Sequence, residues 1–221
     1  MAIYMMRDDG RQPWANTVAY YPLNSTTTVN DLSWNSRNLT NSWVTFGDYN
    51  WVNCASFNGN SYMYRSESLF TGSQDFTVNL WYNRTSDSQN HWNIFSVWTY
   101  DTTNSFIIWL WNDIWADFLK VMFWGWDNDR NTGYFPTKDV WLNIVATHKN
   151  WTVKLYVNWQ SEYSGAVSYT IQSWFTWIWC GVQKNNAMIW KLSNIIVENV
   201  VWSATDVANY YNDTKANYWI S

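Results

Sequence analysis

Glycine is scarce in this sequence of 221 residues, which contains only 8 glycines but 21 tryptophans. Charged residues make up only 14% of the chain, and the net charge is −4. The lysines and arginines form no cluster, which excludes the basic surface typical of a nucleic-acid-binding protein. No apolar run approaches the roughly 18 residues of a membrane-spanning helix. Because the N-terminal segment carries Asp8 and Asp9 and lacks an apolar stretch, we expect no signal peptide.

Cysteine and histidine are almost absent, and their spacing limits two further kinds of site. Cys54 and Cys180 are the only cysteines, and each lies in a strand-like run. Two cysteines do not make a disulfide framework, so we interpret them as buried thiols, with a single disulfide as the alternative. His91 and His148 are distant in sequence from each other and from both cysteines, which excludes the usual spacing of a Cys/His zinc site.

The strongest pattern in the sequence runs from residue 139 to residue 160. Apolar and polar side chains alternate in 140–147 and again in 152–158, which is the period of strands with one buried face. Asn150-Trp151 and Asn158-Trp159 follow these two runs, where a tight hairpin turn needs positive φ and usually has Asn-Gly. The pattern therefore predicts two consecutive hairpin turns.

Comparable runs elsewhere in the chain predict an all-β fold. Strand-like segments bounded by turn residues recur at 17–23, 44–46, 52–57, 62–64, 76–83, 92–98, 105–110, 118–125, 169–171, 175–180 and 189–198. Ser203 and Asp206 have the spacing of a capping box and predict a short helix over about 204–212. We predict a two-sheet antiparallel jelly-roll sandwich with one short C-terminal helix. We expect residues 1–16 to form an N-terminal arm and residues 17–221 to form the sandwich domain.

Several short motifs resemble the laminin G-like, concanavalin A-like lectin/glucanase superfamily. They are an alternating strand ending in Thr147-His148, a strand closing on Tyr156-Val157-Asn158, and the pieces Val18–Leu23, Asp31–Asn35, Ala55–Gly59, Asp75–Trp81 and Trp190–Asn194. The resemblance covers roughly residues 17–218. It implies the sandwich fold, but the superfamily includes lectins, adhesion modules, glycosidases and structural domains, so it does not by itself imply an activity.

Catalytic carboxylates of the glycosidase type are missing. The laminarinase-type relatives in this superfamily carry Glu-x-Asp-x-Glu or Glu-x-Asp-x-x-Glu on one strand, where alternate positions place the carboxylates on one face. The three glutamates here are Glu67, Glu162 and Glu198, and none has an aspartate two residues further on. Gly-x-Ser-x-Gly is absent as well. We therefore expect no enzymatic activity, with a glycoside hydrolase as the least favoured function.

A polar loop over residues 126–134 is the best candidate for ligand recognition. Together with a second aromatic and polar stretch, it supplies the candidate sugar-binding residues Trp126, Asp127, Asn128, Arg130, Tyr134, His91, Trp92 and Asn93. Aromatic rings beside planar polar groups recognise sugars by stacking and hydrogen bonding. The alternative interpretation is an ordinary solvated loop.

Acidic residues of the same loop supply oxygen ligands suited to Ca²⁺. Asp127 and Asp129, with Asp31 as a further ligand, are the candidate metal ligands. We expect no cofactor other than such a structural Ca²⁺. Domains similar to this one often carry an acidic pair on the last long strand, where this sequence has Ser193 and Asn194. The resemblance therefore does not supply a calcium site on that strand.

The shortage of glycine and the excess of tryptophan coincide at the expected turns. In the resembled family, glycine is typical of the positions held here by Trp34, Trp43, Trp51, Trp151, Trp159 and Trp190. A bulky residue at positive φ is strained by about 1–3 kcal/mol. We interpret many of these tryptophans as UGA codons that a bacterial or bacteriophage source reads as glycine. The rival interpretation is that the tryptophans stack on sugar rings.

The two interpretations differ in where the rings should lie. Under the glycine interpretation, exposed rings or positive φ at turns and strand ends are predicted for Trp34, Trp51, Trp151, Trp159 and Trp190. Burial is predicted for Trp81, Trp141 and Trp202, because each falls on an apolar face where a large ring belongs.

We expect a non-catalytic carbohydrate-binding or adhesion module. The alternative is a structural or decoration protein of a phage virion or surface assembly, with the N-terminal arm docking onto a partner. The aromatic and polar loop favours the first function, and the lack of a signal peptide favours the second. The expected partner is a glycan or a surface or virion protein, and the expected location is the extracellular surface or a virion.

Overall fold

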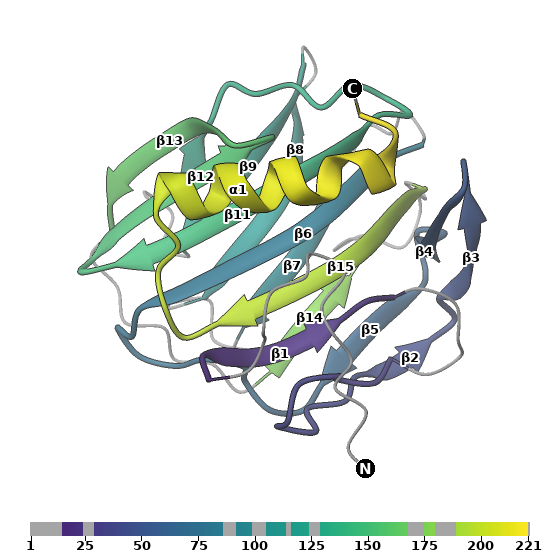
Figure 1. Cartoon of the computed structure of the whole chain (residues 1–221), viewed down its shortest axis with the longest axis horizontal. Coiled ribbons are helices and arrows are strands. Elements are labelled where there is room, and N and C mark those ends of the chain that lie inside the picture. Colours follow the sequence, from purple (N-terminus) through teal and green to yellow (C-terminus); the bar gives the residue numbers. More distant parts are fainter. Residues whose placement is uncertain are drawn as a thin grey trace.

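The computed structural model describes residues 15–23, 29–85, 92–98, 105–113, 116–123, 129–167, 175–179 and 189–220 (Figure 1). The alternating stretch around residue 150 forms the two predicted hairpins. Strands β11 (Trp141–Lys149) and β12 (Thr152–Val157) pair antiparallel, with Lys149 opposite Thr152. Strand β13 (Gln160–Ala166) returns along β12, with Val157 opposite Gln160. Each turn therefore has two residues, as the pattern predicts.

Two antiparallel sheets form the sandwich. Sheet A has the order β13, β12, β11, β6, β15, β4, β3, and β1 also pairs with β15. Its other strands are β1 (Thr17–Tyr21), β3 (Thr45–Tyr49), β4 (Val52–Phe57), β6 (Phe76–Arg84) and β15 (Trp190–Glu198). Sheet B has the order β10, β9, β8, β7, β14, β5, β2. Its strands are β2 (Thr40–Ser42), β5 (Tyr62–Arg65), β7 (Trp92–Trp98), β8 (Phe106–Asp113), β9 (Ala116–Phe123), β10 (Asp129–Asn131) and β14 (Phe175–Trp179).

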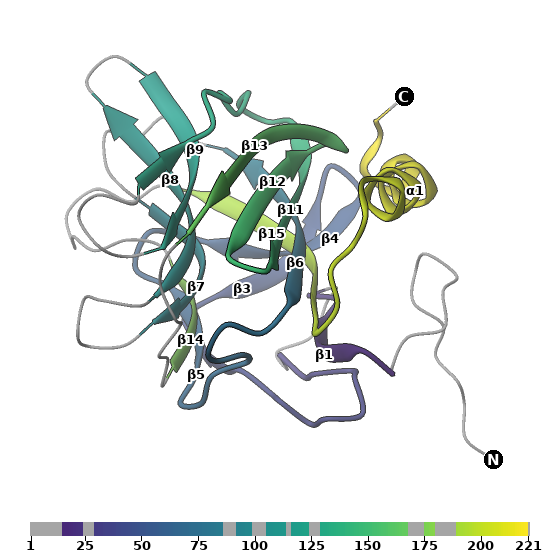
Figure 2. The same cartoon turned by 90° about the vertical axis from the view of Figure 1, so that its left-hand side faces the viewer.

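The centre of sheet A is buried on both faces, as the side chains of β6 show. Phe76, Val78 and Leu80 belong to the large core that also contains residues of sheet B. Trp81 points the other way and joins a second cluster with residues of the C-terminal helix. Figure 2 shows the resulting layers, with α1 on the outer side of sheet A and sheet B on its other side. Each large apolar side chain buried in this way stabilises the fold by about 1.5–3 kcal/mol.

Helix α1 (Ala204–Thr214) begins where the capping pattern predicts. The Asp206 backbone N–H donates to Ser203 Oγ at 3.1 Å, and the Ser203 backbone N–H donates to the Asp206 carboxylate at 2.9 Å. These two bonds satisfy amides that the first helical turn leaves without partners. A 3-10 helix, η1 (Lys215–Tyr218), follows directly. No helix among the described residues is long and apolar enough to cross a membrane.

The tryptophans divide largely as predicted. The rings predicted to be buried are no more than 5% exposed, and they are Trp81, Trp141 and Trp202. The turn tryptophans with exposed rings are Trp34, Trp51, Trp151 and Trp159. The all-β sandwich and this separation of tryptophans are therefore confirmed together.

Trp190 contradicts the prediction. Its ring is only 1% exposed and stacks on Phe57, with ring centroids 4.0 Å apart and planes 4° apart. Residue 190 begins β15, which lies between β6 and β4 in sheet A. The side chain therefore packs in the core of the sandwich instead of leaving a turn.

Cys54 is a buried thiol in β4, as expected. Its Sγ donates a weak hydrogen bond to the Gly47 carbonyl at 3.6 Å. Burial raises the pKa of the thiol to about 11, so it is neutral and unreactive at physiological pH. Cys180 lies outside the described residues.

Candidate functional site

A polar hollow lies beside the end of the 3-10 helix. It measures about 620 Å³ and is bounded by the turn between β3 and β4, a bulge in β15, the residue after β1, and η1. Its lining includes Asn53, Ser193, Asn194, Asn217 and Tyr218. Amide and hydroxyl groups therefore supply most of the side-chain chemistry of the hollow.

A break in strand β15 shapes the floor of the hollow. The pairing of β15 with β6 is irregular between Ser193 and Ile196, and Asn194 within this bulge has a φ of 49°. Asparagine tolerates this left-handed conformation better than most residues. The Asn194 Nδ2 donates to the Tyr218 hydroxyl at 2.9 Å, and its Oδ1 accepts from the Tyr20 hydroxyl at 3.1 Å. Bulges often redirect side chains in this way next to functional sites.

Two hydroxyl groups extend this network. Tyr218 donates to Ser193 Oγ at 3.1 Å, and Ser193 donates to the Asn53 carbonyl at 3.2 Å. The Tyr218 ring stacks on Trp81, with ring centroids 3.8 Å apart and planes 10° apart. Burial raises the pKa of Tyr218 well above its usual range, so the hydroxyl stays neutral. The floor is therefore an uncharged network whose geometry is fixed by packing.

The rim carries exposed polar groups and exposed rings. The side chains of Asn53 and Asn217 are exposed, and each amide offers two N–H donors and a carbonyl acceptor. The indoles of Trp51 and Trp219 are 84% and 73% exposed. Tyr218 is the one titratable residue among the described residues of the lining, and it is held neutral. The hollow can therefore form hydrogen bonds with a ligand.

The loop predicted to bind sugar is described only in part. His91, Trp126, Asp127 and Asn128 lie outside the described residues. Residues 129–131, predicted as loop, form the short strand β10 and pair with residues 120–122 of β9. A three-residue edge strand is too short to show an alternating pattern, which is why the sequence did not indicate it.

Strand pairing brings the two predicted sugar-binding stretches to one end of sheet B. Asn93 lies opposite Trp109, Trp109 opposite Lys120, and Lys120 opposite Asn131, the neighbour of Arg130. Three steps between strands separate Asn93 from β10, which amounts to about 14 Å. That distance is too long for both stretches to contact one sugar ring. Binding by this set, which includes Trp92, stays a prediction.

The two predicted residues whose side chains are described are partly built into the fold. Asn93 is buried. Tyr134 is half-buried and packs against the sandwich core, and its carbonyl accepts from the Leu119 N–H at 3.0 Å. Burial, with a smaller effect of the Glu162 charge, raises the pKa of the Tyr134 hydroxyl. Of this pair, only Tyr134 presents part of its surface to a ligand.

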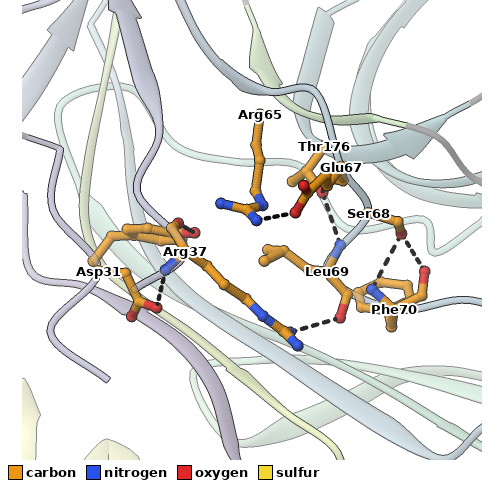
Figure 3. Close-up of polar contacts among 9 residues, drawn as sticks. Asp31, Arg37, Arg65, Glu67, Ser68, Leu69, Phe70 and Thr176 are labelled. Carbon is orange, nitrogen blue, oxygen red and sulfur yellow. Dashed lines mark hydrogen bonds and ion pairs between the residues drawn. The ribbon is translucent and has the colours of Figure 1, made fainter. Parts of the chain in front are cut away.

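Asp31, predicted as a metal ligand, organises its own loop. Its Oδ1 accepts from the backbone N–H groups of Tyr20 and Ser33, at 2.9 and 2.8 Å. Its Oδ2 accepts from the Ser33 hydroxyl at 2.7 Å and from the Arg37 backbone N–H at 2.8 Å. Figure 3 shows the carboxylate facing the Arg37 backbone, while the Arg37 guanidinium donates to the Leu69 carbonyl at 3.2 Å. Four hydrogen bonds therefore occupy the carboxylate.

The structure does not bring Asp31 together with Asp129. Asp31 is bonded to β1, whereas Asp129 begins β10, the partner of β9, and β1 and β9 lie on opposite sides of the view in Figure 2. Among the described residues, no three His, Cys, Asp or Glu side chains form a group that could hold a metal ion. A calcium site built on Asp127 and Asp129 stays a prediction.

The three glutamates lie on separate elements. Glu67 follows β5 and forms an ion pair with Arg65 (Figure 3). Glu162 is on β13, and Glu198 is at the end of β15, where its Oε2 accepts from Trp202 Nε1 at 2.6 Å. Strands β13 and β15 are separated by β12, β11 and β6. No two glutamates are therefore placed as neighbours on one strand or on adjacent strands.

No sequence motif marks the hollow. Asn53 and Asn217 come from the start of β4 and from the 3-10 helix, two segments that only the folded chain brings together. The one available signal is Ser193-Asn194, a polar break in the middle of an apolar strand. A polar break of this kind predicts a local irregularity, but it does not indicate which segments face it.

Comparisons with known proteins agree with the observed architecture. The family described as the concanavalin A-like lectin/glucanases superfamily matches residues 57–208. No curated protein matches the chain in sequence.

Solved structures with the same architecture include a domain of an arabinanase and the binding domain of a mosquitocidal protein. Domain 4 of AbnA, a GH43 extracellular arabinanase from Geobacillus stearothermophilus solved in complex with arabinotriose, has a TM-score of 0.72 and 14% identity, covering 89% of this chain and 98% of that chain. The binding domain of Paraclostridial Mosquitocidal Protein 1 has a TM-score of 0.69 and 16% identity, with coverage of 89% and 52%.

A structure of botulinum neurotoxin type C is also similar, and its cell entry is described as dependent on interaction with two ganglioside molecules. It has a TM-score of 0.66 and 12% identity, covering 89% of this chain and 51% of that chain. The chain thus spans about half the length of these two toxin structures. At such identities the likeness shows the fold alone.

Proposed function

The chain belongs to the concanavalin A-like lectin/glucanase superfamily, and from this premise we propose that it is a non-catalytic carbohydrate-binding protein. The proposed site is the hollow beside the 3-10 helix. The observation that carries the proposal is the pair of exposed amides at Asn53 and Asn217 above an uncharged floor of buried hydroxyl and amide groups. The loop at 126–134 stays a second candidate site.

The chemistry of the hollow suits a sugar better than other small ligands. Sugar hydroxyls both donate and accept hydrogen bonds, and so do carboxamides. A phosphate or carboxylate ligand would find no opposite charge in the lining, and an isolated buried charge is strongly unfavourable. The volume of about 620 Å³ lies within the roughly 300–1,000 Å³ of small-ligand sites. A short oligosaccharide is therefore the proposed ligand.

Binding is proposed without hydrolysis. Glycosidases need two carboxyl groups on either side of the scissile bond, about 5–9.5 Å apart. The described residues of the lining include no carboxylate, and the three glutamates of the chain lie on separate elements. Incubation with oligosaccharides should therefore yield no product. Hydrolysis that is lost in Asp127→Ala or Asp129→Ala would contradict the non-enzyme proposal.

The similar structures support a carbohydrate ligand. One is domain 4 of the arabinanase AbnA in complex with arabinotriose, and one is botulinum neurotoxin type C, whose cell entry depends on interaction with two ganglioside molecules. These ligands are known for those proteins, and their chemistry defines the first probes for this chain. Arabinotriose and ganglioside head-group oligosaccharides belong in the same binding panel as a general glycan array.

The test compares one double variant of the rim with a matched control and the unaltered protein. Asn53→Ala and Asn217→Ala, combined in one protein, remove both exposed amides, whereas Asn212→Ala removes an exposed amide from helix α1 away from the hollow. Each lost hydrogen bond is worth about 0.5–1.5 kcal/mol, so the double variant should bind the best glycan of the panel about 10-fold more weakly or worse. Asn212→Ala should bind like the unaltered protein, and all three should have similar melting temperatures.

Two results would overturn the proposal. Binding that is unchanged in the double variant would move the site away from the hollow. Absence of binding to every glycan would reject the carbohydrate function and leave the structural role in a virion or surface assembly as the remaining prediction.

A further inference from the structure

Within the described residues, five tryptophans have a left-handed backbone. Their φ angles are 65° at Trp43, 66° at Trp51, 64° at Trp151, 71° at Trp159 and 58° at Trp219. Residues with a Cβ rarely adopt this region because the Cβ approaches a backbone carbonyl oxygen, and a bulky residue there is an outlier. Glycine has no Cβ and adopts the same angles without strain.

All five rings are also exposed. The exposed fractions are 82%, 84%, 43%, 48% and 73% in the same order. The tryptophans buried in the described part of the chain have ordinary backbones, and they are Trp81, Trp109, Trp141, Trp190 and Trp202. The strained tryptophans therefore gain no core packing that would offset their strain.

Three of the five stand at the second position of a two-residue hairpin loop. The loops are Asn50-Trp51, Asn150-Trp151 and Asn158-Trp159, and their asparagines also have positive φ, at 50°, 46° and 47°. Two positive φ angles in succession are required by the type I′ turn, for which Asn-Gly is strongly preferred. The asparagine of this pair is present in all three loops, and only its glycine partner is missing.

Trp219 occupies another position where glycine is usual, the residue after a helix end. Its N–H donates to the Ala216 carbonyl at 3.3 Å, and the Ile220 N–H donates to the Lys215 carbonyl at 3.3 Å. This pair of bonds defines the Schellman motif, whose left-handed residue is most often glycine. The Schellman motif at the helix end, like the type I′ turns of the hairpins, therefore favours glycine where this chain has tryptophan.

We propose that these five positions are glycine in the functional protein, because their codons are UGA triplets that the source translates as glycine. Translation of the same gene with UGA read as tryptophan would place a tryptophan at every such codon. Tryptophans encoded by UGG would remain where the core has space for the ring. One cause then accounts for both the 8 glycines and the 21 tryptophans of the sequence.

Sugar stacking does not account for this distribution. Trp151 precedes β12 and Trp159 follows it, so the two lie at opposite ends of a six-residue strand, roughly 20 Å apart. Trp51 and Trp219 line the hollow, but Trp43, Trp151 and Trp159 are not among its lining residues. Aromatic platforms for one ligand would gather around one site. All five positions share a backbone conformation, but only two of them share a location.

The inference bears on the proposed binding site without depending on it. Glycine at positions 51 and 219 would widen the mouth of the hollow and leave the amides of Asn53 and Asn217 as its recognition groups. If glycine at both positions abolished glycan binding, this inference would be contradicted. If neither form of the protein bound a glycan, only the proposed function would fail.

The codons of the gene give the first test. UGA is expected at positions 43, 51, 151, 159 and 219, and UGG is expected at the buried Trp81, Trp141 and Trp202. Mass spectrometry of the protein isolated from its source should find glycine at the five UGA positions. UGG at the five turn positions, or tryptophan in the isolated protein, would refute the inference.

Thermal unfolding gives an independent test on the chain as translated with tryptophan. Trp51→Gly and Trp151→Gly should each raise the melting temperature by about 2–4 °C, because each relieves strain and removes an exposed indole. Trp81→Gly is the matched control, since it makes the same change at a fully buried ring. It should lower the melting temperature by roughly 10 °C or more, or prevent folding. Melting temperatures that fall in the turn variants would mean that tryptophan belongs there.

Discussion

Tyr218→Phe removes one hydroxyl from the floor of the hollow and leaves the ring in place. That hydroxyl accepts from Asn194 Nδ2 at 2.9 Å and donates to Ser193 Oγ at 3.1 Å. The phenylalanine ring would keep the stack on Trp81, whose centroid is 3.8 Å from that of Tyr218. The substitution therefore isolates the contribution of the buried polar network from that of the apolar packing.

The expected loss follows from the groups left behind. Ser193 still donates to the Asn53 carbonyl, but one N–H of Asn194 loses its acceptor in a site where Ser193, Asn194 and residue 218 are buried. A buried donor without a partner costs about 1–3 kcal/mol, so we expect a total loss of about 2–3 kcal/mol once the removed hydrogen bond is included. For a domain of this size the melting temperature should fall by roughly 4–12 °C.

Tyr49→Phe is the matched control. The Tyr49 hydroxyl donates to the Asp139 carboxylate at 2.8 Å in an exposed contact, where water can replace the lost partner. The same atom removed from this position should cost less than about 1 kcal/mol. Urea unfolding of both variants, followed by tryptophan fluorescence, measures the difference. Equal losses in the two variants would show that the network under the hollow is not rigid and buried in solution.

The remaining predictions concern pH, the helix cap and the 126–134 loop. Burial raises the pKa of Cys54 from 9.0 to about 11 and that of Tyr218 well above 10.0, so both bind their protons more tightly folded than unfolded. Their contribution to the free energy of unfolding is full below about pH 9 and is lost as the pH rises beyond about 9. Urea unfolding at a series of pH values would measure this loss. A free energy of unfolding that rises above about pH 9 would contradict the prediction. Ser203→Ala should cost about 0.5–2 kcal/mol by the same assay, because it breaks the capping box, and no loss would mean that the cap is redundant. Trp126→Ala and Asp127→Ala should weaken glycan binding by about 1–3 kcal/mol if the loop is a second site, and unchanged affinity would restrict binding to the hollow.

Local signals in the sequence predict most of the fold. The alternation of residues 140–147 and 152–158 and the intervening Asn-Trp pairs predict the hairpins, because strand period and turn chemistry involve only near neighbours. The capping pair Ser203 and Asp206 predicts the start of α1 for the same reason. Local signals do not predict strand β10, because a short edge strand is defined by its pairing with β9.

Trp190 shows the limit of reasoning from turn positions. A resemblance to a family with glycine there predicts an exposed ring, yet the strand order places residue 190 between β4 and β6, where the side chain packs on Phe57. The hollow is missed for a related reason. Asn53 and Asn217 become neighbours only because η1 lies beside the β3–β4 turn, and that contact is tertiary.

Chemical-shift mapping with a bound glycan tests the central claim most directly. Isotope-labelled protein, titrated with arabinotriose or with the best oligosaccharide of the binding panel, should show its largest backbone amide shifts at Asn53, Asn194, Asn217 and Tyr218, around the hollow. Residues on β12 and β13 should shift little, because they lie away from the lining. Shifts concentrated at residues 91–93 and 126–134 instead would place the site on the loop, and no shifts with any glycan would contradict carbohydrate binding.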